Sequence, residues 1–369
     1  MRVAVLAHVR HPIRAPFAGG MEAHAWHLVK GLEARGHDVS LFASGDGDPD
    51  LPLHPVCDEH YDRRFPWHVF HGTEALNVHL DGIFARLCGT LIAEGFDVVH
   101  NNSLHRFPPR LSRSRRIPMV SSMHVPPFGP LRRAIEDSDA PWHLKTVTSR
   151  QQMGRWWDAP PATARVVHNG IDLRVWPFRA EGDGTAIWAG RIARNKGTAL
   201  AAEAAGRAGV PLRLFGPVEE RDYFDAEVAP HLSRTVRYEG HLPGGALADA
   251  LGRASALLFT PMWDEPFGLA AIEAMATGLP VAAFDNGAVR EVVGPCGRYA
   301  ASGDVEGLAT ALREVMGLSR HAARGRVETM FSLDAMLDGY EALYREAVAA
   351  RDAAWPEGRF TERELALTA

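Results

Sequence analysis

The chain has 369 residues and a formal net charge of −5, with 40 Lys and Arg against 45 Asp and Glu. This length predicts two domains, and the 23% share of charged residues excludes a chain that is disordered throughout. The charge balance argues against nucleic-acid binding, and no apolar run is long enough to predict a membrane-spanning helix. Cys57, Cys88 and Cys296 lie far apart in the sequence, which is typical of a reduced, cytoplasmic protein without a disulfide or zinc framework.

The first half of the chain alternates short apolar runs with helical patterns. Residues 2–9 predict a buried first strand rather than a secretion signal, because the apolar stretch is short and no cleavage site follows it. A helical pattern through Leu28 and Leu32 ends at Gly36, and a second strand is predicted at residues 39–43. Next come a helical pattern from Leu76 to Leu91 and short strands at 98–99, 119–121 and 146–148.

The second half repeats this alternation. Strands are predicted at residues 186–189, 212–215, 236–238, 256–260 and 280–284. Ala-rich amphipathic helices are predicted between them, at 199–208, 246–254 and 269–277. Strands that alternate with helices predict an α/β fold of two doubly wound parallel sheets. In such folds ligands bind beyond the carboxyl ends of the strands, which here would lie in a cleft between the domains.

A turn-rich segment separates the two halves. Pro160 and Pro161 end the preceding helical pattern, and the sequence Asn-Gly-Ile-Asp at 169–172 has the composition of a turn. We therefore place the two domains at residues 1–165 and 166–334. A helical pattern over residues 332–350 predicts a final helix, and the last ~15 residues are polar and expected to fray.

Gly19 and Gly20 stand after the first predicted strand and open a helix. Paired glycines let backbone N–H groups approach an anion, and a helix N-terminus favours negative charge. The spacing is not the G-x-G-x-x-G of dinucleotide-binding proteins. An ordinary turn between strand and helix is the alternative interpretation.

Arg191 and Lys196 flank a turn that follows a predicted strand. A guanidinium binds phosphate oxygens as a fork and an ammonium binds them as a point charge, so the two side chains suit a diphosphate. A solvated basic turn is the alternative.

Glu265 and Glu273 are separated by seven residues around the start of a predicted helix. Phe267, Gly268 and Leu269 fall at the N-terminus of that helix, where free N–H groups can meet a hydroxyl or a phosphate. Two acids at this spacing suit the hydroxyls of a sugar and of a ribose. The helix dipole alone explains an acid at Glu265 but not at Glu273, which stands among apolar residues and needs a partner.

His124 ends the predicted strand that begins near residue 119. The carboxyl edge of an α/β sheet is where ligand sites lie, so His124 is a candidate for the site. A structural histidine is the alternative.

Taken in order, these motifs resemble the retaining glycosyltransferases of family four, which have the GT-B fold. The resemblance spans about residues 2–348 and depends most on the E-x7-E pattern, then on AGRIARNKG, HNGID and GG-x-E. It implies two Rossmann-like domains facing a central cleft, an acceptor domain at 1–165 and a donor domain at 166–334. It also implies that a C-terminal helix over about residues 335–369 crosses back onto the first domain.

The resemblance also implies a reaction and its residues. A hexosyl group would pass from a nucleotide-diphosphate sugar to a small-molecule, saccharide or lipid hydroxyl, with UDP-glucose as the default donor and GDP-mannose as the main rival. Arg191 and Lys196 would hold the diphosphate, Glu273 the ribose, and Glu265 the donor sugar. By the same resemblance, His124 would lie near the donor sugar and the acceptor, and Gly19 and Gly20 would belong to a loop that closes over the phosphate and the acceptor. The backbone of Phe267, Gly268 and Leu269 would contact the sugar and the phosphate. His241 and Leu242 would line the nucleotide base.

The mechanism implied is a front-face displacement in which the leaving phosphate takes the acceptor proton, with no metal and no cofactor. Three Asp-x-Asp triplets, Asp46/Asp48, Asp48/Asp50 and Asp137/Asp139, lie in polar loops, and we interpret them as solvated turns.

Other interpretations stay open. The basic run from Arg106 to Arg116 would suit an anionic lipid or a phosphorylated acceptor. It lacks an apolar face, and Pro108 and Pro109 are expected to interrupt a helix there, so we favour a solvated face and expect no membrane contact. A nucleotide-sugar epimerase of the same fold and a non-catalytic sugar-binding relative are the alternative functions.

Overall fold

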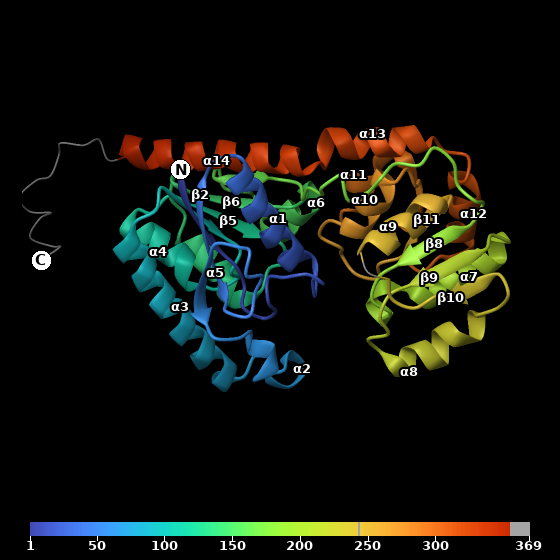
Figure 1. The fold of residues 1–369 in the computed structure, drawn as a ribbon, viewed down its shortest axis with the longest axis horizontal. Coiled ribbons are helices and arrows are strands. Elements are labelled where there is room, and N and C mark those ends of the chain that lie inside the picture. Colours follow the sequence, from blue (N-terminus) through green and yellow to red (C-terminus); the bar gives the residue numbers. More distant parts are fainter. Residues whose placement is uncertain (243, 355–369) are drawn as a thin grey trace, which may run out of the picture. The chain divides into compact units, whose positions relative to one another are not determined.

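The computed structural model describes residues 1–242 and 244–354. The chain divides into two compact units, and each is built around one parallel sheet (Figure 1). The first unit comprises Met1–Val147, Trp156–Val167 and, of the described residues, 337–354. The second comprises Thr148–Arg155 and His168–Met336. Among the described helices none is long and apolar enough to span a membrane.

The sheet of the first unit has seven parallel strands in the order β3-β2-β1-β4-β5-β6-β7. The order reverses between β1 and β4, so the loops that follow these two strands diverge and leave space for a ligand. The strands are β1 (Arg2–Leu6), β2 (Asp38–Ser44), β3 (Leu53–Cys57), β4 (Val98–Asn101), β5 (Met119–Met123), β6 (His143–Val147) and β7 (Ala164–Val166).

Helices cover both faces of this sheet. Ala4 and Leu6 of β1 pack with Phe84 and Leu87 of α3 in one buried cluster. On α1, a side chain in place of Gly31 would collide with Leu337 of α14, so these two helices pack closely. The predicted return of the last helix onto the first unit is therefore confirmed. The helices are α1 (Gly20–Ala34), α2 (Trp67–Phe70), α3 (Glu74–Glu94), α4 (Phe107–Arg115), α5 (Gly129–Asp137) and α14 (Leu333–Ala354). α6 (Arg150–Trp156) follows β6 in the chain, but all of it except Trp156 belongs to the second unit.

The two prolines of the basic run lie inside a helix. The prediction that Pro108 and Pro109 interrupt a helix is wrong, because α4 begins at Phe107 and both prolines lie in its first turn. Proline is tolerated there since its missing N–H would have no partner within the helix. The predicted fraying of the last residues falls outside the part of the chain that the structure describes.

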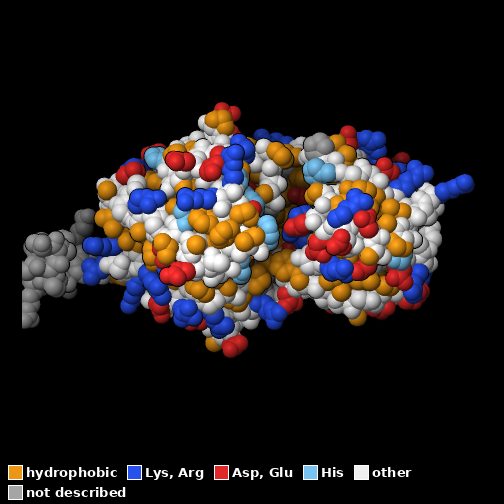
Figure 2. Space-filling view, turned by 90° about the horizontal axis from the view of Figure 1, so that it is seen from below, with side chains coloured by type: hydrophobic (Ala, Val, Ile, Leu, Met, Phe, Trp, Pro, Cys, Tyr) orange, Lys and Arg blue, Asp and Glu red, His pale blue; other side chains and the backbone are white. Residues whose placement is uncertain are grey.

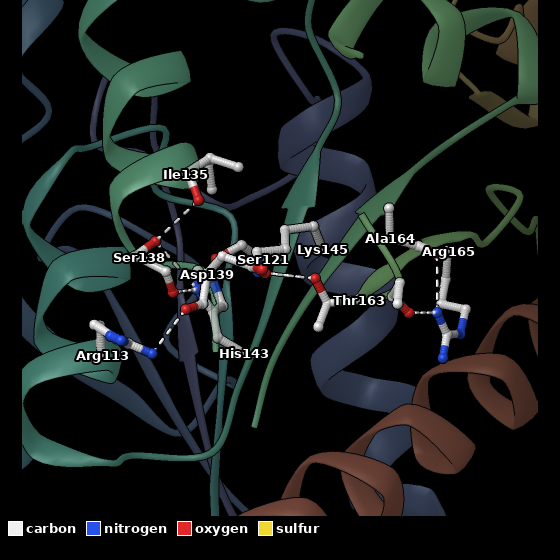
Figure 3. A network of polar contacts seen from close by, with 11 residues as sticks. Arg113, Ser121, Ile135, Ser138, Asp139, His143, Lys145, Thr163, Ala164 and Arg165 are labelled. Atoms are coloured by element: carbon white, nitrogen blue, oxygen red, sulfur yellow. Dashed lines mark hydrogen bonds and ion pairs between the residues drawn. The ribbon is translucent and has the colours of Figure 1, made fainter. Parts of the chain in front are cut away.

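A buried ion pair joins β6 to the loop after α5 (Figure 3). Lys145 has a side chain that is 1% exposed, and its ammonium contacts Asp139 and donates to the Thr163 hydroxyl over 3.0 Å. Burial lowers the pKa of Lys145, although Asp139 opposes the shift. Asp139 is therefore a structural partner of Lys145 rather than the solvated turn residue that we expected.

This arrangement predicts unequal effects of removing the two partners. Asp139→Asn leaves an ammonium buried without a counter-charge and should lower the free energy of unfolding by about 2 kcal/mol. Lys145→Met leaves the carboxylate of Asp139, whose side chain is half exposed to water. This substitution should therefore lower the free energy of unfolding by less than half as much. Urea unfolding of both variants measures the difference. Equal losses would contradict the assignment of Lys145 as the buried partner.

The second unit has six parallel strands in the order β10-β9-β8-β11-β12-β13. Alternate side chains point to opposite faces of the sheet, so the neighbouring residues Ile187 and Trp188 belong to two different buried clusters. The strands are β8 (Ala186–Ala189), β9 (Leu212–Phe215), β10 (Val236–Tyr238), β11 (Ala256–Phe259), β12 (Val281–Phe284) and β13 (Gly297–Ala300). The helices are α7 (Thr198–Ala208), α8 (Arg221–Tyr223), α9 (Gly244–Arg253), α10 (Leu269–Ala276), α11 (Val289–Val293), α12 (Val305–Val315) and α13 (Arg320–Met330).

The segment Thr148–Arg155 belongs to the second unit although it follows β6 of the first. The hydroxyls of Thr148 and Ser149 donate to the Pro266 carbonyl over 3.0 and 2.8 Å. The Glu291 carboxylate accepts from the N–H groups of Arg150 and Gln151 at the start of α6. The first two bonds tie the segment to the loop that contains Glu265, and the other two tie it to α11.

Candidate functional site

The second unit brings a lysine and a glutamate together where its strand order reverses. Lys196 lies in the loop after β8 and Glu265 in the loop after β11, and these strands are neighbours in the sheet. The Lys196 ammonium donates to Glu265 Oε2 over 2.9 Å, and both side chains are mostly buried. Two of the predicted site residues, 69 positions apart in sequence, are thus in contact.

Hydrogen bonds to backbone carbonyls hold these two loops together. The Thr260 hydroxyl donates to the Lys196 carbonyl over 2.8 Å, and the Met262 N–H donates to the Asn195 carbonyl over 2.8 Å. The Lys196 ammonium also lies 5.3 Å from the centre of the Trp263 ring. The indole N–H of Trp263 is buried and has no acceptor in the described part of the chain. Sequence reasoning missed Trp263, because a tryptophan beside a loop is ordinary core material.

Arg191 lies on the same loop but does not contact Lys196. Its guanidinium pairs with the Glu219 carboxylate, and both side chains are about half exposed. An exposed pair of this kind contributes little to stability and is easily exchanged for another anion. Glu219, which follows β9, was not predicted from sequence, and only the adjacency of β8 and β9 identifies it.

Glu273 lies on α10, partly buried, and has no hydrogen-bond or ion-pair partner among the described residues. Burial raises its pKa to about 7. We expected a partner for this acid from its apolar sequence neighbours, and within the described protein there is none. A carboxyl group held in this way favours a ligand that donates hydroxyls to it.

Phe267, Gly268 and Leu269, at the start of α10, combine a buried side chain with backbone groups at a helix N-terminus. The Phe267 side chain is 3% exposed and packs 5.6 Å from the Phe331 ring, so only its backbone is available to a ligand. Gly268 precedes α10 with φ of 99°, and Leu269 begins the helix. The predicted helix N-terminus is therefore present at these residues.

The two residues predicted at the base differ in their surroundings. Leu242 is partly buried and packs on the cluster that contains Phe267 and Ile272. His241 is exposed, and it follows Gly240, whose carbonyl accepts from the Gly216 N–H over 2.9 Å. This bond links the loops after β9 and β10 at the same edge of the sheet.

Gly287 packs closely against the backbone of Glu265. A side chain at Gly287 would place its Cβ 2.3 Å from the Glu265 carbonyl oxygen and 2.4 Å from its nitrogen, and the φ of 59° favours glycine. The next residue, Ala288, donates its N–H to the Glu265 carbonyl over 2.9 Å. The position of Glu265 therefore depends on a glycine that sequence analysis did not single out.

Gly287→Ala should accordingly displace Glu265. We expect kcat/KM for the donor to fall by at least about tenfold, because misplacing a binding group by about an ångström has effects of this order or larger. Gly303→Ala is the matched control, because Gly303 has φ of 81° but no atom within 4 Å of the Cβ that an alanine would add. Steady-state kinetics of both variants make the comparison, and an equal loss in the control would assign the effect to backbone strain alone.

In the first unit the loop with Gly19 and Gly20 is close to a buried acid. Glu22, in the first turn of α1, is 2% exposed and accepts from His8 Nε2 over 2.8 Å. Burial works to raise the pKa of Glu22, but the bonds from His8 and the backbone outweigh it, and the pKa is lowered. The positive end of α1 therefore already faces a carboxylate, which the glycine pattern did not indicate.

His124 follows β5, is partly buried, and contacts a group of buried polar side chains. Its Nε2 lies 3.2 Å from Asn102 Oδ1, and its ring centre is 4.2 Å from that of His24. Burial lowers the pKa of His124 to about 4 and that of His24 well below its ordinary value, so both rings are neutral at pH 7. Both ring nitrogens of His24 are buried without a partner in the described protein.

Charged groups elsewhere offer little to an anion or a metal. In the basic run, Arg106 pairs with Asp81 and Arg110 with Asp137, and Figure 2 shows Lys and Arg interspersed with Asp and Glu on the face it draws. No group of three or more potential metal ligands occurs among the described residues. Of the Asp-x-Asp residues, Asp46 binds His60 and Asp48 accepts from the Trp26 indole over 2.7 Å.

Two family models match the chain, one in each half. The model described as Glycosyltransferase Family 4 matches residues 18–175, and the model described as Glycosyl transferases group 1 matches residues 183–317. Glycogen synthase of Mycobacterium tuberculosis strain H37Rv is 27% identical over 361 residues, which cover 86% of this chain and 86% of that protein.

Solved structures of low sequence identity share the fold. Sucrose-phosphate synthase from Thermosynechococcus elongatus superposes with a TM-score of 0.74 at 22% identity, over 95% of this chain and 99% of that one. Anabaena Alr3699/HepE, solved in complex with UDP-glucose, superposes with a TM-score of 0.69 at 16% identity, over 94% of this chain and 100% of that one. With the two family models and the two parallel sheets, these likenesses lead to one conclusion: the chain belongs to glycosyltransferase family 4 and is a transferase with the GT-B fold.

Proposed function

We propose that the protein transfers a hexosyl group from a nucleotide-diphosphate sugar to an acceptor hydroxyl, with retention at the anomeric carbon. The observation that carries the proposal is the 2.9 Å contact between Lys196 and Glu265 at the point where the strand order of the second sheet reverses. An ammonium for the diphosphate and a carboxylate for sugar hydroxyls are the two groups that a nucleotide sugar requires of such a site.

Besides the contact of Glu265 with the sugar hydroxyls, the donor would engage the second unit through four kinds of contact. Lys196 and Arg191 neutralise the diphosphate, and each first leaves its carboxylate partner, Glu265 or Glu219. Glu273 accepts the ribose hydroxyls, which suits an acid without a protein partner. The backbone of Phe267, Gly268 and Leu269 contacts sugar and phosphate, and His241 and Leu242 line the base.

The reaction would proceed on one face of the sugar. The bond between the anomeric carbon and the leaving phosphate oxygen breaks, and a bond from that carbon to the acceptor oxygen forms on the same face. The acceptor proton passes to the leaving phosphate. Arg191 and Lys196 stabilise the charge that grows on this phosphate, which is stabilisation specific to the transition state. The proposal includes no metal and no cofactor.

The first unit would bind the acceptor. We place His124 near the donor sugar and acceptor and the loop with Gly19 and Gly20 over them, as the family resemblance implies. UDP-glucose is the donor we propose, in line with the structure of Alr3699/HepE in complex with UDP-glucose. For the acceptor we keep the three classes expected from the sequence, which are a small molecule, a saccharide and a lipid. The cytoplasmic location also stays a prediction.

A thermal-shift series with UDP, GDP, ADP and their sugars tests the donor. Only the folded state binds the nucleotide, so the true donor raises the unfolding temperature. We expect the largest rise with UDP and UDP-glucose and an unchanged rise in the presence of a chelator. A larger rise with GDP would replace UDP-glucose by a GDP-sugar, and no rise with any nucleotide would overturn the proposal.

The anomeric configuration of the product tests the mechanism. With UDP-glucose the product should be the α-glucoside, which the coupling constant of the anomeric proton identifies. A β-glucoside would contradict the front-face displacement. Interconversion of donor sugars without transfer to an acceptor would favour the epimerase alternative.

A further inference from the structure

We infer that a buried tyrosine of the last helix, acting through His100 and Asn102, sets which ring nitrogen of His124 carries the proton. The contacts that carry this inference all lie within the first unit. The inference rests on the proposed function only in placing His124 beside the substrates.

The first step is the hydrogen bond of Tyr344. Its side chain is fully buried on α14, and its hydroxyl lies 2.6 Å from His100 Nδ1. That nitrogen is the one polar partner of the hydroxyl in the described protein. Burial raises the pKa of Tyr344 well above its ordinary value, so the proton is retained. The hydroxyl therefore donates to Nδ1, since accepting there would leave its own proton without an acceptor.

The second step is the tautomer of His100. Burial lowers its pKa to about 3, so the ring is neutral and carries one proton. Because Nδ1 accepts from Tyr344, that proton is on Nε2. His100 Nε2 lies 3.1 Å from Asn102 Oδ1 and 3.1 Å from the Ser122 hydroxyl. The amide nitrogen of Asn102 is itself a donor and cannot face this N–H at hydrogen-bond distance, so the atom of Asn102 that faces it is the carbonyl oxygen.

The third step reaches His124. The same Asn102 Oδ1 lies 3.2 Å from His124 Nε2. A carbonyl oxygen has two lone pairs and can accept from both histidines, so His124 also carries its proton on Nε2. Its Nδ1 is left with a lone pair. His124 therefore offers a substrate a hydrogen-bond acceptor, which suits a hydroxyl and not a phosphate oxygen.

A count of unpaired groups decides between this arrangement and the flipped amide. As placed, the Asn102 amide nitrogen is the one buried polar side-chain atom of Tyr344, His100 and Asn102 without a partner in the described protein. With the amide flipped, both the Tyr344 proton and the Asn102 carbonyl would lack partners. Each unpaired buried polar group is costly, so the first arrangement is favoured.

The test is the 15N spectrum of histidine-labelled, substrate-free protein, in which protonated and unprotonated ring nitrogens have well-separated shifts. The His124 signals are assigned by their loss in His124→Gln. We expect a proton on Nε2 and none on Nδ1. A proton on Nδ1 would overturn the inference, whatever the activity of the protein. Because no substrate is present, failure of the proposed function does not affect this result.

A matched pair of variants tests the role of the tyrosine. Tyr340 is a second buried tyrosine on α14, one turn earlier, and its hydroxyl accepts from Ser122 rather than contacting a histidine nitrogen. Tyr344→Phe should give a mixture of His124 tautomers and lower kcat about fivefold, the effect of one hydrogen bond, without changing the donor KM. Tyr340→Phe should keep the tautomer, and Asn102→Asp should keep it too, because a carboxylate still accepts. Identical His124 spectra in the two tyrosine variants would contradict the inference.

Discussion

Lys196→Ala should lower kcat/KM for the nucleotide-sugar donor by about 10²–10³-fold, because a positive charge aimed at a developing anion typically contributes this much. In the free protein the Lys196 ammonium is held by Glu265 at 2.9 Å and lies over the Trp263 ring. Removing the ammonium also leaves the Glu265 carboxylate unpaired beside the bound diphosphate. Loss of attraction and added repulsion therefore act in the same direction.

Two further variants separate these effects. Glu265→Gln in the Lys196→Ala background should restore part of the donor affinity, because it removes the repulsion. Arg194→Ala is the control for the turn, since Arg194 lies two residues away and pairs with Glu227 instead. Donor titration and steady-state kinetics of the three proteins provide the comparison. Unchanged turnover in Lys196→Ala would exclude Lys196 from the diphosphate site.

Glu273→Gln should make the free protein more stable at pH 8 and weaken its binding of the donor. The pKa of Glu273 is about 7 in the folded protein, against an ordinary value of 4.5. The folded state therefore holds this proton more tightly than the unfolded state, and stability falls as the pH rises from 4.5 to 7. Above pH 7 the charged, partly buried Glu273 costs up to about 3 kcal/mol. Glutamine has nearly the same shape and avoids this cost.

The pH dependence provides the control within the same experiment. At pH 5 the wild-type carboxyl is protonated in the folded state, so most of the stability difference should disappear. Donor affinity should change in the opposite sense, because only the ionised carboxyl accepts from both ribose hydroxyls. In the wild type the donor Kd should approach a tenfold rise per pH unit below 7, and in Glu273→Gln it should be flat. A wild-type affinity that does not change between pH 6 and pH 8 would exclude Glu273 from the ribose site.

The central strands were predictable because they are buried on both faces. The central strands β8 and β9 lie at the predicted residues, and β11 and β12 each end or begin one residue from the prediction. β10 also lies at the predicted residues, although it is at an edge of its sheet. The strands that sequence analysis missed, β3, β7 and β13, are all at the edges of their sheets. An edge strand buries less surface and tolerates polar residues and proline, as Pro55 of β3 shows, so it leaves little apolar pattern.

The residues of the candidate site also divide into those that could be predicted from the sequence and those that could not. Arg191, Lys196, Glu265 and Glu273 could be identified as site candidates from the sequence. A glycine-rich turn after a strand and an acid within an apolar helix are both local patterns. The side chains and backbone groups that these residues contact could not be predicted from the sequence. Glu219, Trp263 and Gly287 come from other loops, and nothing near them in the sequence indicates which charge or backbone they contact.

The amino-acid sequence by itself determined the fold class, because strand and helix periodicity specify two doubly wound sheets. The resemblance of its short motifs at strand ends to those of family four glycosyltransferases indicated the class of enzyme. The tertiary structure alone decided which groups meet. Lys196 and Glu265 are 69 residues apart, and Tyr344 and His100 are 244 apart. Periodicity reports only how one segment buries its own face, whereas contacts over such separations depend on strand order and on the packing of α14, and the protonation of His124 follows from those contacts.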